Sequence, residues 1–562
     1  MNKRESFGVA TAAMAAAAMA ATVAAVVLAG PAGGQQEPPA SQFGETVEVR
    51  VINLEVVVTD KQGLSVTALG PQDFELKVDG KAVPIQHFTE VRGGDAIEGP
   101  SEGPDIPGVP QLAPGTPVGT SYLVFIDEFF SLERDRNHVL DKLATDLALL
   151  RPEDRMAIVA YDGRKLDMLT SWSQSAAELE RTLRRAGSRK AYGLQRSADD
   201  RRFTDNQRLD RLPSGPRGFI DSTQMRLDVD ERNYAQSLEE QVRNVVLAST
   251  AALRGFANPP GRKVLLLLSG GWPYDVIDYI VNDYNRTVLE SQIQRGDVLF
   301  EPLISTANQL GYTIYGVDMP GLGAESAASA EYAVGANFSD RKQLFQRENN
   351  IQYSLESVSR ETGGEALLNG ERDKVLSAAA SDTRNYYWIG FTPPWEGSDS
   401  KHKVTIDALV EGLRVRNRSG YVDFSTRRET SMMVESVLLF GERPGVAPLP
   451  VELGTREKSG GGTMMVPITL RIPLGHLTVL QQGDLYVAEV ELRVAALDDR
   501  GGRSEIPVIP VSLSLPGRPP AGAYATYTTT LQLRRVRNQL VLAVSDPVGG
   551  AIYSARMEVA PN

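Results

Sequence analysis

The run of apolar residues at 122–126 is the feature that most limits what this chain can fold into. In the sequence SYLVFIDEFFS (residues 121–131), the run ends at Asp127, and a hydroxyl follows at Ser131. A helical pattern begins almost at once. Such a run beside a helix is typical of a parallel strand that is covered on both faces. Ligands of these sheets bind at the carboxyl ends of the strands, so we expect Asp127 and Ser131 at a binding edge.

Residues 121–391 continue this alternation of strands and helices. Apolar runs at 156–161, 264–268 and 312–317 are separated by helical stripes such as Leu140, Leu143, Leu147 and Leu150. Alternating strands and helices require right-handed crossovers. The sequence therefore predicts an α/β domain with a mostly parallel, Rossmann-like sheet and helices on both faces.

Regions rich in strand patterns flank this domain. In residues 46–91, Val47, Val49 and Val51 alternate with charged residues, and Asp79-Gly80 is a strong hairpin signal. We expect a small N-terminal β domain with the form of a sandwich, followed by a Gly/Pro-rich linker at 92–120.

The C-terminal part returns to β patterns. Residues 392–425 are predicted to form a β-hairpin extension. Residues 430–562 contain alternating runs separated by Pro and Gly turns, which favours a β-sandwich of immunoglobulin-like type. The predicted fold class is thus multidomain α/β plus β.

The N-terminus has the order of an export signal. Lys3 and Arg4 precede a long Ala/Val-rich run, and small residues and Pro31 follow it. We interpret residues 1–34 as a signal peptide, which predicts a secreted or periplasmic protein. The alternative is an uncleaved membrane anchor, because the run is long enough to span a bilayer. No other stretch is apolar enough to do so.

Composition excludes several function classes. The chain has no cysteine, which excludes disulfide frameworks and thiolate sites, and its net charge of −12 argues against nucleic-acid binding. The sequence also lacks a His-Glu-x-x-His motif, and its Gly-x-Ser-x-Gly match, at residues 99–103, lies in the Gly/Pro-rich linker and not at a strand-to-helix elbow. We therefore expect no catalytic residues, no bound organic cofactor and no enzyme activity.

Two long insertions interrupt the α/β pattern. Residues 187–232 are polar and Arg-rich, and residues 272–295 carry several aromatic side chains. Arg201 and Arg202 of the first insertion and Trp272 and Tyr274 of the second are candidates for contact with a partner. The alternatives are a solvated, partly disordered loop for the first insertion and local loop packing for the second.

Asp127 and Ser131 resemble the metal-site segment of von Willebrand factor type A (VWA) domains. That segment reads Asp-x-Ser-x-Ser, and Phe129 stands here at the middle Ser. Gly270 stands where the family places a second carboxylate. The resemblance implies a degenerate Mg²⁺ or Mn²⁺ site at Asp127 and Ser131, with Glu128 or Asp275 as replacement carboxylates. The alternative is that Asp127 caps the following turn by accepting backbone N–H bonds.

The order of the whole chain resembles the VWFA-related family of secreted bacterial proteins, which is of Acidobacterial type. The resemblance spans residues 46–421. It is carried by short segments at 56–60, 73–80, 125–127, 153–161, 262–271, 316–318, 361–366, 386–393 and 415–421. Type A domains generally bind protein partners at the top of the sheet.

The leading interpretation is therefore an exported binding or adhesion protein that contacts a protein of the cell envelope through the top of its sheet. A metal-dependent envelope hydrolase is the first alternative, suggested by Asp127, Glu128 and Asp275. A structural scaffold whose β domains dock to other proteins is the second.

Overall fold

The computed structural model describes residues 51–561, with gaps at 98–112, 211–219, 257–260, 281–292, 321–337, 441–446, 484, 500–503, 505 and 521. The predicted export signal, 1–34, lies outside the described residues. The chain divides into two compact units, and the division falls between Gly441 and Glu442. None of the helices in the described ranges is long and apolar enough to span a bilayer.

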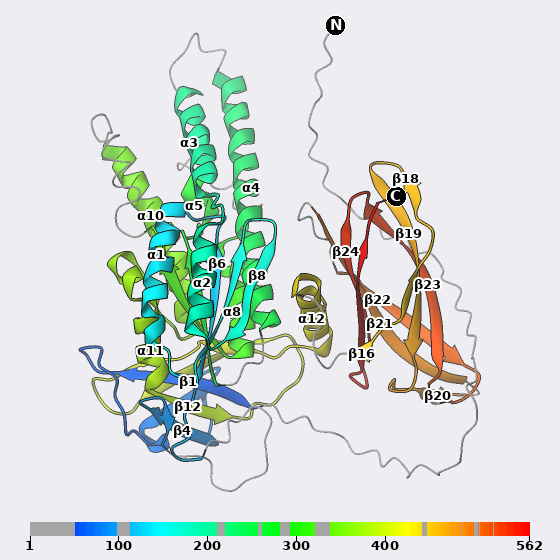
Figure 1. Cartoon of the computed structure of the whole chain (residues 1–562), viewed down its shortest axis with the longest axis horizontal. Helices are drawn as coiled ribbons and strands as arrows, with labels where there is room; N and C mark the ends of the chain where they lie inside the picture. The colour runs from blue at the N-terminus through cyan, green and yellow to red at the C-terminus, as the bar shows by residue number, and fades with distance from the viewer. Residues whose placement is uncertain are drawn as a thin grey trace. The chain divides into compact units, whose positions relative to one another are not determined.

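A six-stranded sheet forms the centre of the first unit (Figure 1). Its strand order is β11-β10-β9-β6-β7-β8. Five strands are mutually parallel, and only the edge strand β8 runs antiparallel to its neighbour. The strands are β6 (Thr120–Asp127), β7 (Arg155–Tyr161), β8 (Leu166–Ser173), β9 (Arg262–Ser269), β10 (Tyr312–Asp318) and β11 (Ala366–Leu367). The prediction of a mostly parallel sheet is confirmed.

Helices cover both faces of this sheet, as predicted. On one face, Val139, Leu140 and Leu143 of α1 are buried against Val124 and Ile126 of β6. This face is covered by α1 (Glu133–Asp146), α2 (Ala176–Gly187) and α11 (Val375–Arg384). The other face is covered by α4 (Ile220–Gly255), α5 (Val276–Ile280), α7 (Gly296–Leu299), α8 (Glu301–Leu310) and α10 (Phe338–Glu361). Burial of both faces explains why β6 is apolar without alternation.

The N-terminal strands do not form a sheet of their own. β1 (Ile52–Thr59) pairs with β12 (Tyr386–Phe391) and β14 (Arg414–Arg416), and β2 (Phe74–Val78) pairs with β13 (Lys401–Ala408). One apolar cluster joins these strands. The predicted domain at 46–91 and extension at 392–425 are therefore parts of one small β structure. β12, which the sequence analysis assigned to the α/β domain, also belongs to this β structure. A residue pattern predicts that a strand forms, but it does not predict which strand pairs with it.

The remaining strands of this β structure are short. They are β3 (Lys81–Ala82), β4 (His87–Arg92), β5 (Asp95–Ala96) and β15 (Gly420–Val422). β4 pairs with β12, and β5 pairs with β4. β5 lies in the predicted linker at 92–120, so the described start of that segment is partly ordered in a sheet.

The described parts of the insertion at 187–232 are mainly helical. They contain α3 (Gly193–Asp210) and the first part of α4. In Figure 1 these two helices rise beyond the top of the central sheet. The alternative of a solvated, partly disordered loop is therefore wrong for the residues in these two helices. The sequence analysis did not predict these helices, because their hydrophobic periodicity is weak, as expected for helices that project from a core.

The second unit is a β-sandwich. One sheet contains β16 (Ala447–Pro448), β20 (Leu480–Gln482), β21 (Leu485–Asp498), β22 (Val508–Leu515), β24 (Asn538–Ser545) and β25 (Ile552–Val559). The other contains β17 (Val451–Leu453), β18 (Glu457–Ser459), β19 (Thr463–Pro473) and β23 (Tyr524–Arg534). One apolar core joins the facing sides of both sheets.

The start of the predicted domain at 430–562 is helical. α12 (Thr426–Phe440) precedes the sandwich, and it belongs to the first unit, where it packs against α4. Its residues Val434, Val437 and Leu438 are buried. An ion pair of 2.5 Å joins Glu435 of α12 to Arg254 of α4.

Candidate functional site

Asp127 ends β6 at the carboxyl edge of the central sheet, where the sequence predicted a site. Its side chain is fully buried. One oxygen, Oδ1, accepts hydrogen bonds of 3.1 Å from the backbone N–H groups of Phe129 and Phe130. The other, Oδ2, accepts from the Ser269 hydroxyl at 2.7 Å and from the Trp272 indole N–H at 2.8 Å. Four donors therefore surround this carboxylate, which is the capping role that the sequence allowed as an alternative.

Ser131 lies in the same loop, but its hydroxyl does not face the Asp127 carboxylate. It donates to the backbone carbonyl of Asp127 and is fully buried. The backbone carbonyl of Ser131 accepts from the N–H of Gly193, at the start of α3. The carbonyl of Glu128 accepts from the N–H of Tyr192. We call residues 127–131 the rim loop, and these two bonds fix the base of α3 to it.

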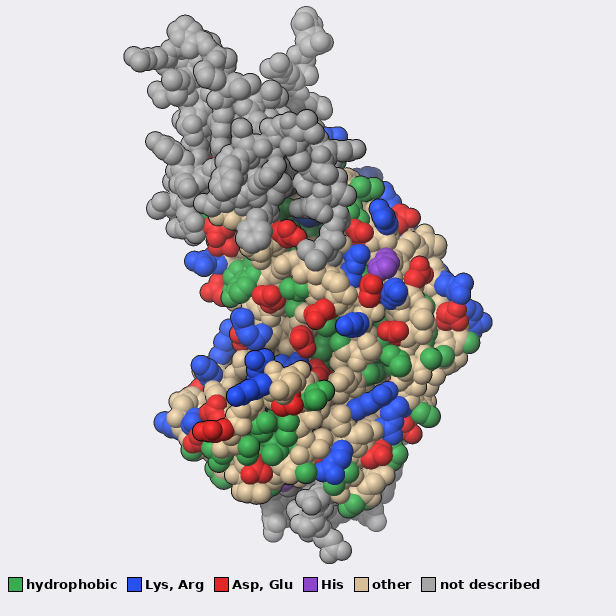
Figure 2. All heavy atoms as spheres, turned by 90° about the vertical axis from the view of Figure 1, so that its left-hand side faces the viewer, with side chains coloured by type: hydrophobic (Ala, Val, Ile, Leu, Met, Phe, Trp, Pro, Cys, Tyr) green, Lys and Arg blue, Asp and Glu red, His purple; other side chains and the backbone are tan. Residues whose placement is uncertain are grey.

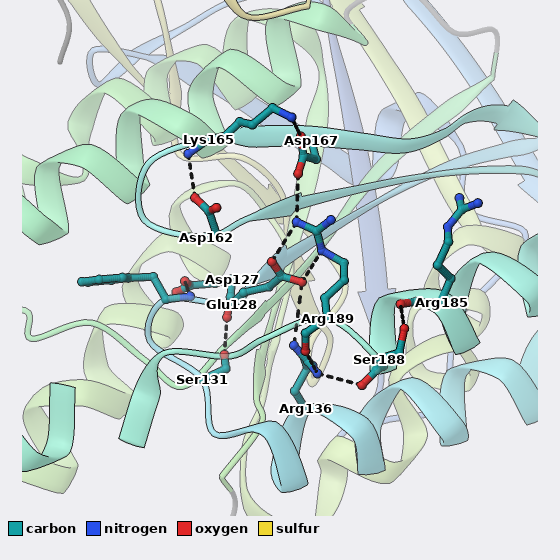
Figure 3. Close-up of polar contacts among 12 residues, drawn as sticks. Asp127, Glu128, Ser131, Arg136, Asp162, Lys165, Asp167, Arg185, Ser188 and Arg189 are labelled. Carbon is teal, nitrogen blue, oxygen red and sulfur yellow. Dashed lines mark hydrogen bonds and ion pairs between the residues drawn. The ribbon is translucent and has the colours of Figure 1, made fainter. Parts of the chain in front are cut away.

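Glu128 is the second buried carboxylate of the rim loop (Figure 3). Arg189 donates to it through Nε at 2.7 Å and through Nη2 at 3.1 Å. Nη1 of Arg136, which is fully buried, lies 3.7 Å from Oε1 of Glu128. Nη2 of Arg136 also donates to the backbone carbonyls of Gly187 and Arg189. The two guanidinium groups thus attach the α2–α3 connection to the rim loop.

Electrostatics follow from this burial. Loss of hydration raises the pKa of Asp127, and the hydrogen bonds from Trp272 and Ser269 oppose the rise. Burial also raises the pKa of Glu128 against the effect of Arg189, and it lowers the pKa of Arg136. Because burial disfavours the charged forms of these groups, their hydrogen-bond partners are needed to offset the lost hydration in the folded state.

Asp167 extends the network to β8. Burial acts to raise its pKa, but hydrogen bonds from Lys165 and Arg189 outweigh burial, and the pKa is lowered. Arg189 lies 2.9 Å from Asp167, and Lys165 lies 2.5 Å from it. Arg189 therefore joins two carboxylates, one from the rim loop and one from β8, as Figure 3 shows.

The residues present do not fit the divalent metal that the resemblance implies. Mg²⁺ requires oxygen ligands with free lone pairs at close range. Both Asp127 oxygens already accept two donors each, and the Ser131 hydroxyl is directed to a carbonyl. A Cβ at Gly270 would lie 2.1 Å from the carbonyl oxygen of Phe130, so that position has no space for a carboxylate side chain.

The other carboxylates considered from sequence have different roles. Glu128 is bound by Arg189 and Arg136, as described above. Oδ1 of Asp275 accepts from the backbone N–H groups of Ile277 and Asp278, which is an N-terminal cap for α5. No group of three or more His, Asp or Glu side chains suited to a metal exists in the described part of the chain.

Of the predicted partner-contact residues, Trp272 lies in the core. Its ring is fully buried and packs near Phe300, with ring centroids 5.7 Å apart. Tyr274 is partly buried, and its ring packs edge-on against that of Tyr353, with ring centroids 4.6 Å apart. Trp272 therefore offers no exposed ring to a partner, and its indole N–H already donates to Asp127. This is the local loop packing that the sequence allowed as an alternative.

The two predicted arginine contacts lie on α3. Arg202 is exposed and pairs with Asp199 one turn away, at 3.7 Å. The backbone of Arg201 is helical, and its side chain lies outside the described residues. Both positions are on the arm and away from the buried network of Glu128.

Arg136 is a residue of this site that the sequence analysis did not identify. Arg136 precedes Val139, Leu140 and Leu143 at intervals of three, four and seven, so it occupies the apolar stripe of α1. A charged residue on such a stripe is the signal that could have predicted its burial.

The exposed charge on the face drawn in Figure 2 is mixed in sign. Figure 2 shows acidic and basic side chains interspersed over one face, without a broad area of either sign. Surface ion pairs such as Arg184 with Glu180 contribute to this mixture. Such a surface does not attract a polyanion over a large area.

No family model matches the sequence, and no curated protein matches it. Solved structures are similar to it. The vWF domain of the type V pili tip protein Mfa5 from Porphyromonas gingivalis is 12% identical, with a TM-score of 0.14, and the match covers 27% of this chain and 38% of that one. This chain thus matches well under half of the Mfa5 domain.

Two further matches are longer. A von Willebrand factor type A structure from Catenulispora acidiphila is 11% identical, with 93% of this chain and 76% of that chain covered and a TM-score of 0.24. The pilus adhesin SpaC from Lactobacillus rhamnosus GG is 10% identical, with 79% and 53% covered and a TM-score of 0.24. The TM-scores are low, so the fold class rests on the strand order and direction given above.

Proposed function

We propose that this chain is an exported binding protein of the cell envelope, without enzyme activity, that holds a protein partner at the top of its central sheet. We also propose that it belongs to the VWFA-related secreted bacterial proteins that its sequence resembles. The observation that carries the proposal is the helical arm, α3 with the first part of α4, which is attached to the rim loop by backbone hydrogen bonds.

The length of α4 supports an exposed binding element. Its 36 residues correspond to about 54 Å, whereas the eight residues of β6 span about 26 Å. From Ala235 onward, α4 contributes fully buried side chains to the apolar core of the sheet, and Tyr234 and Phe203 of α3 are partly buried against that core. Tyr234 stacks on Phe203, with ring centroids 4.2 Å apart, and Val229 is 46% exposed. An arm that extends this far from the sheet and exposes an apolar side chain at Val229 favours a role in contact with other molecules.

The rim loop supports binding over hydrolysis. A general base needs an accessible carboxylate within hydrogen-bond reach of a water or substrate. Asp127 and Glu128 are both buried and both already bonded to fixed donors.

The pilus proteins Mfa5 and SpaC, named above among the similar structures, are a type V pili tip protein and a pilus adhesin. An adhesive role for this chain is part of the proposal.

The test compares the full exported chain with an arm variant. Residues 205–229 are replaced by a short Gly-Ser linker, which leaves the Phe203–Tyr234 stack at the base. Both proteins are cross-linked to intact envelope of the producing organism, and the captured proteins are identified. We expect the complete chain to capture a defined protein that the arm variant loses, while both proteins keep the same melting temperature.

Capture of the same proteins by both forms would contradict the role of the arm. The hydrolase alternative is tested separately by a broad hydrolase screen with and without Mg²⁺. Turnover that is lost in Asp127→Asn, in a variant shown to be folded, would favour hydrolysis over binding.

A further inference from the structure

β23 is a long edge strand of the C-terminal sandwich. It pairs with β19 over eleven residues, from Tyr524 opposite Pro473 to Arg534 opposite Thr463, without a register shift. β17 and β18 pair with the other side of β19. Within the part of the chain that the structure describes, no strand pairs with the second side of β23. A row of backbone N–H and C=O groups on that side therefore has no strand partner.

The other described edge strands carry features that prevent pairing with another chain. Native proteins use short length, charges, prolines and bulges for this purpose. β22 contains Pro510, and β8 contains two register irregularities and Asp167. The strands at the other ends of the sheets are two or three residues long, namely β3, β5, β11, β14, β15, β16, β17, β18 and β20. β25, which extends beyond its two-residue pairing with β16, carries Arg556 and Glu558 in that part. β23 differs from all of these.

β23 has none of these features over most of its length. Residues 524–533 read YATYTTTLQL, without charge, proline or glycine, and are rich in β-branched threonine. Thr528, Thr530 and Gln532 are exposed on the outer face, whereas Ala525, Tyr527 and Leu533 are buried on the core face. Thr529 and Leu531, also on the core face, are only partly buried, as expected where a sheet ends.

We propose that β23 pairs antiparallel with β23 of a second copy of this chain, about a twofold axis at Thr529. This joins the two four-stranded sheets into one continuous sheet. The proposal is independent of the rim loop and of the helical arm.

The sequence of β23 is compatible with itself in this register. Thr528 lies opposite Thr530 on the outer face, and Tyr527 lies opposite Leu531 on the core face. Polar side chains therefore face polar ones, and apolar side chains face apolar ones. The single charged residue, Arg534, lies opposite Tyr524 and so meets no like charge. Arg534 is also neutralised within its own chain by Asp498, at 2.7 Å. This compatibility selects a second copy as the partner over an unrelated extended segment.

Charge substitution on the outer face tests the proposal. Sedimentation velocity of the full exported chain is expected to show a dimer at micromolar concentration. Thr528→Lys combined with Thr530→Lys places like charges opposite each other across the axis, so we expect at least tenfold weaker dimerisation. The control, Gln62→Lys with Gln72→Lys, adds the same charge at exposed turns of the other unit and should dimerise as the wild type does.

A single cysteine gives a second readout, because the natural chain has none. Residues directly opposite across an antiparallel pair have Cα atoms about 4.5–5.5 Å apart, which suits a disulfide. We expect Thr529→Cys to form a covalent dimer on mild oxidation, faster than Gln72→Cys. A monomeric wild-type chain at about 100 μM, a dimer unaffected by the two lysines, or equal oxidation rates of the two cysteine variants would each overturn the proposal.

Discussion

The rim loop of the α/β unit and the free edge of β23 satisfy their polar groups in opposite ways. In the rim loop, both oxygens of Asp127 and of Glu128 are bonded to donors of the same chain and are removed from water. Along β23, one row of backbone groups has no strand partner in the described residues. Buried polar groups without partners cost stability, whereas groups at a surface can bond to water or to another chain. The rim should therefore govern folding, and the edge should govern association.

The largest expected effect is at Glu128. Glu128→Ala leaves the fully buried Arg136 without its carboxylate, which should lower the free energy of unfolding by roughly 3–5 kcal/mol. Urea unfolding followed by circular dichroism measures the change. Glu180→Ala, which breaks the exposed pair with Arg184, is the matched control and should cost less than about 1 kcal/mol. Equal costs at the two positions would remove the distinction drawn for the rim.

Asp127→Ala is expected to cost on the order of 3 kcal/mol, because it leaves the donors of Ser269, Trp272 and two backbone amides without an acceptor. The same unfolding experiment applies. Asp127→Asn keeps the shape and one acceptor oxygen, so its cost should be smaller. A loss below about 0.5 kcal/mol for the alanine variant would show that these hydrogen bonds do not hold the rim.

Trp272→Phe removes the indole N–H but keeps an aromatic ring in the core. We expect a loss of about 1–2 kcal/mol, from one unmade hydrogen bond to a carboxylate and a small change of volume. Trp172→Phe is the control, since the ring of Trp172 packs edge-on against Phe256 and is only partly buried. A larger loss at Trp172 would argue that volume, and not the hydrogen bond, sets the effect.

Asp79 is an intermediate case, because its side chain is exposed but is bonded to one other side chain. The hydrogen bond from His402, at 2.8 Å, and that from the backbone N–H of Lys403 lower the pKa of Asp79. A lowered pKa in the folded state means that its stabilisation is complete above the ordinary carboxyl pKa of about 3.9 and disappears as pH falls through the lowered value. Melting temperatures of the wild type and Asp79→Asn should differ at pH 6 and converge as the pH falls below the lowered pKa of Asp79. A difference that persists at acid pH would indicate that the carboxylate charge is not its source.

The smallest expected effect is at the edge strand. Thr528→Lys changes an exposed side chain, so the free energy of unfolding should stay within about 0.5 kcal/mol of the wild type at a concentration where the chain is monomeric. Urea unfolding measures this together with the rim variants. A loss comparable with that of Trp272→Phe would mean that the edge contributes to folding as the rim does.

Sequence alone determined the architecture around the sheet. The apolar run of β6, the helical stripe of α1 and the carboxyl-edge position of Asp127 each depend on residues close together in the chain. Their spacing is enough to distinguish a buried parallel strand from a surface one and to predict the edge where Asp127 lies. The departures at Phe129 and Gly270 also indicated from sequence that the resembled metal site was incomplete.

Only the tertiary structure decided what Asp127 does and which strands pair. The indole of Trp272 is 145 residues from Asp127 in sequence, and β1 pairs with β12 across most of the unit. Local periodicity states which face of an element is buried, but it does not state which distant group it meets there. Contacts of this kind are selected by the packing of the whole core, because a buried donor and acceptor have no other partner available once water is excluded.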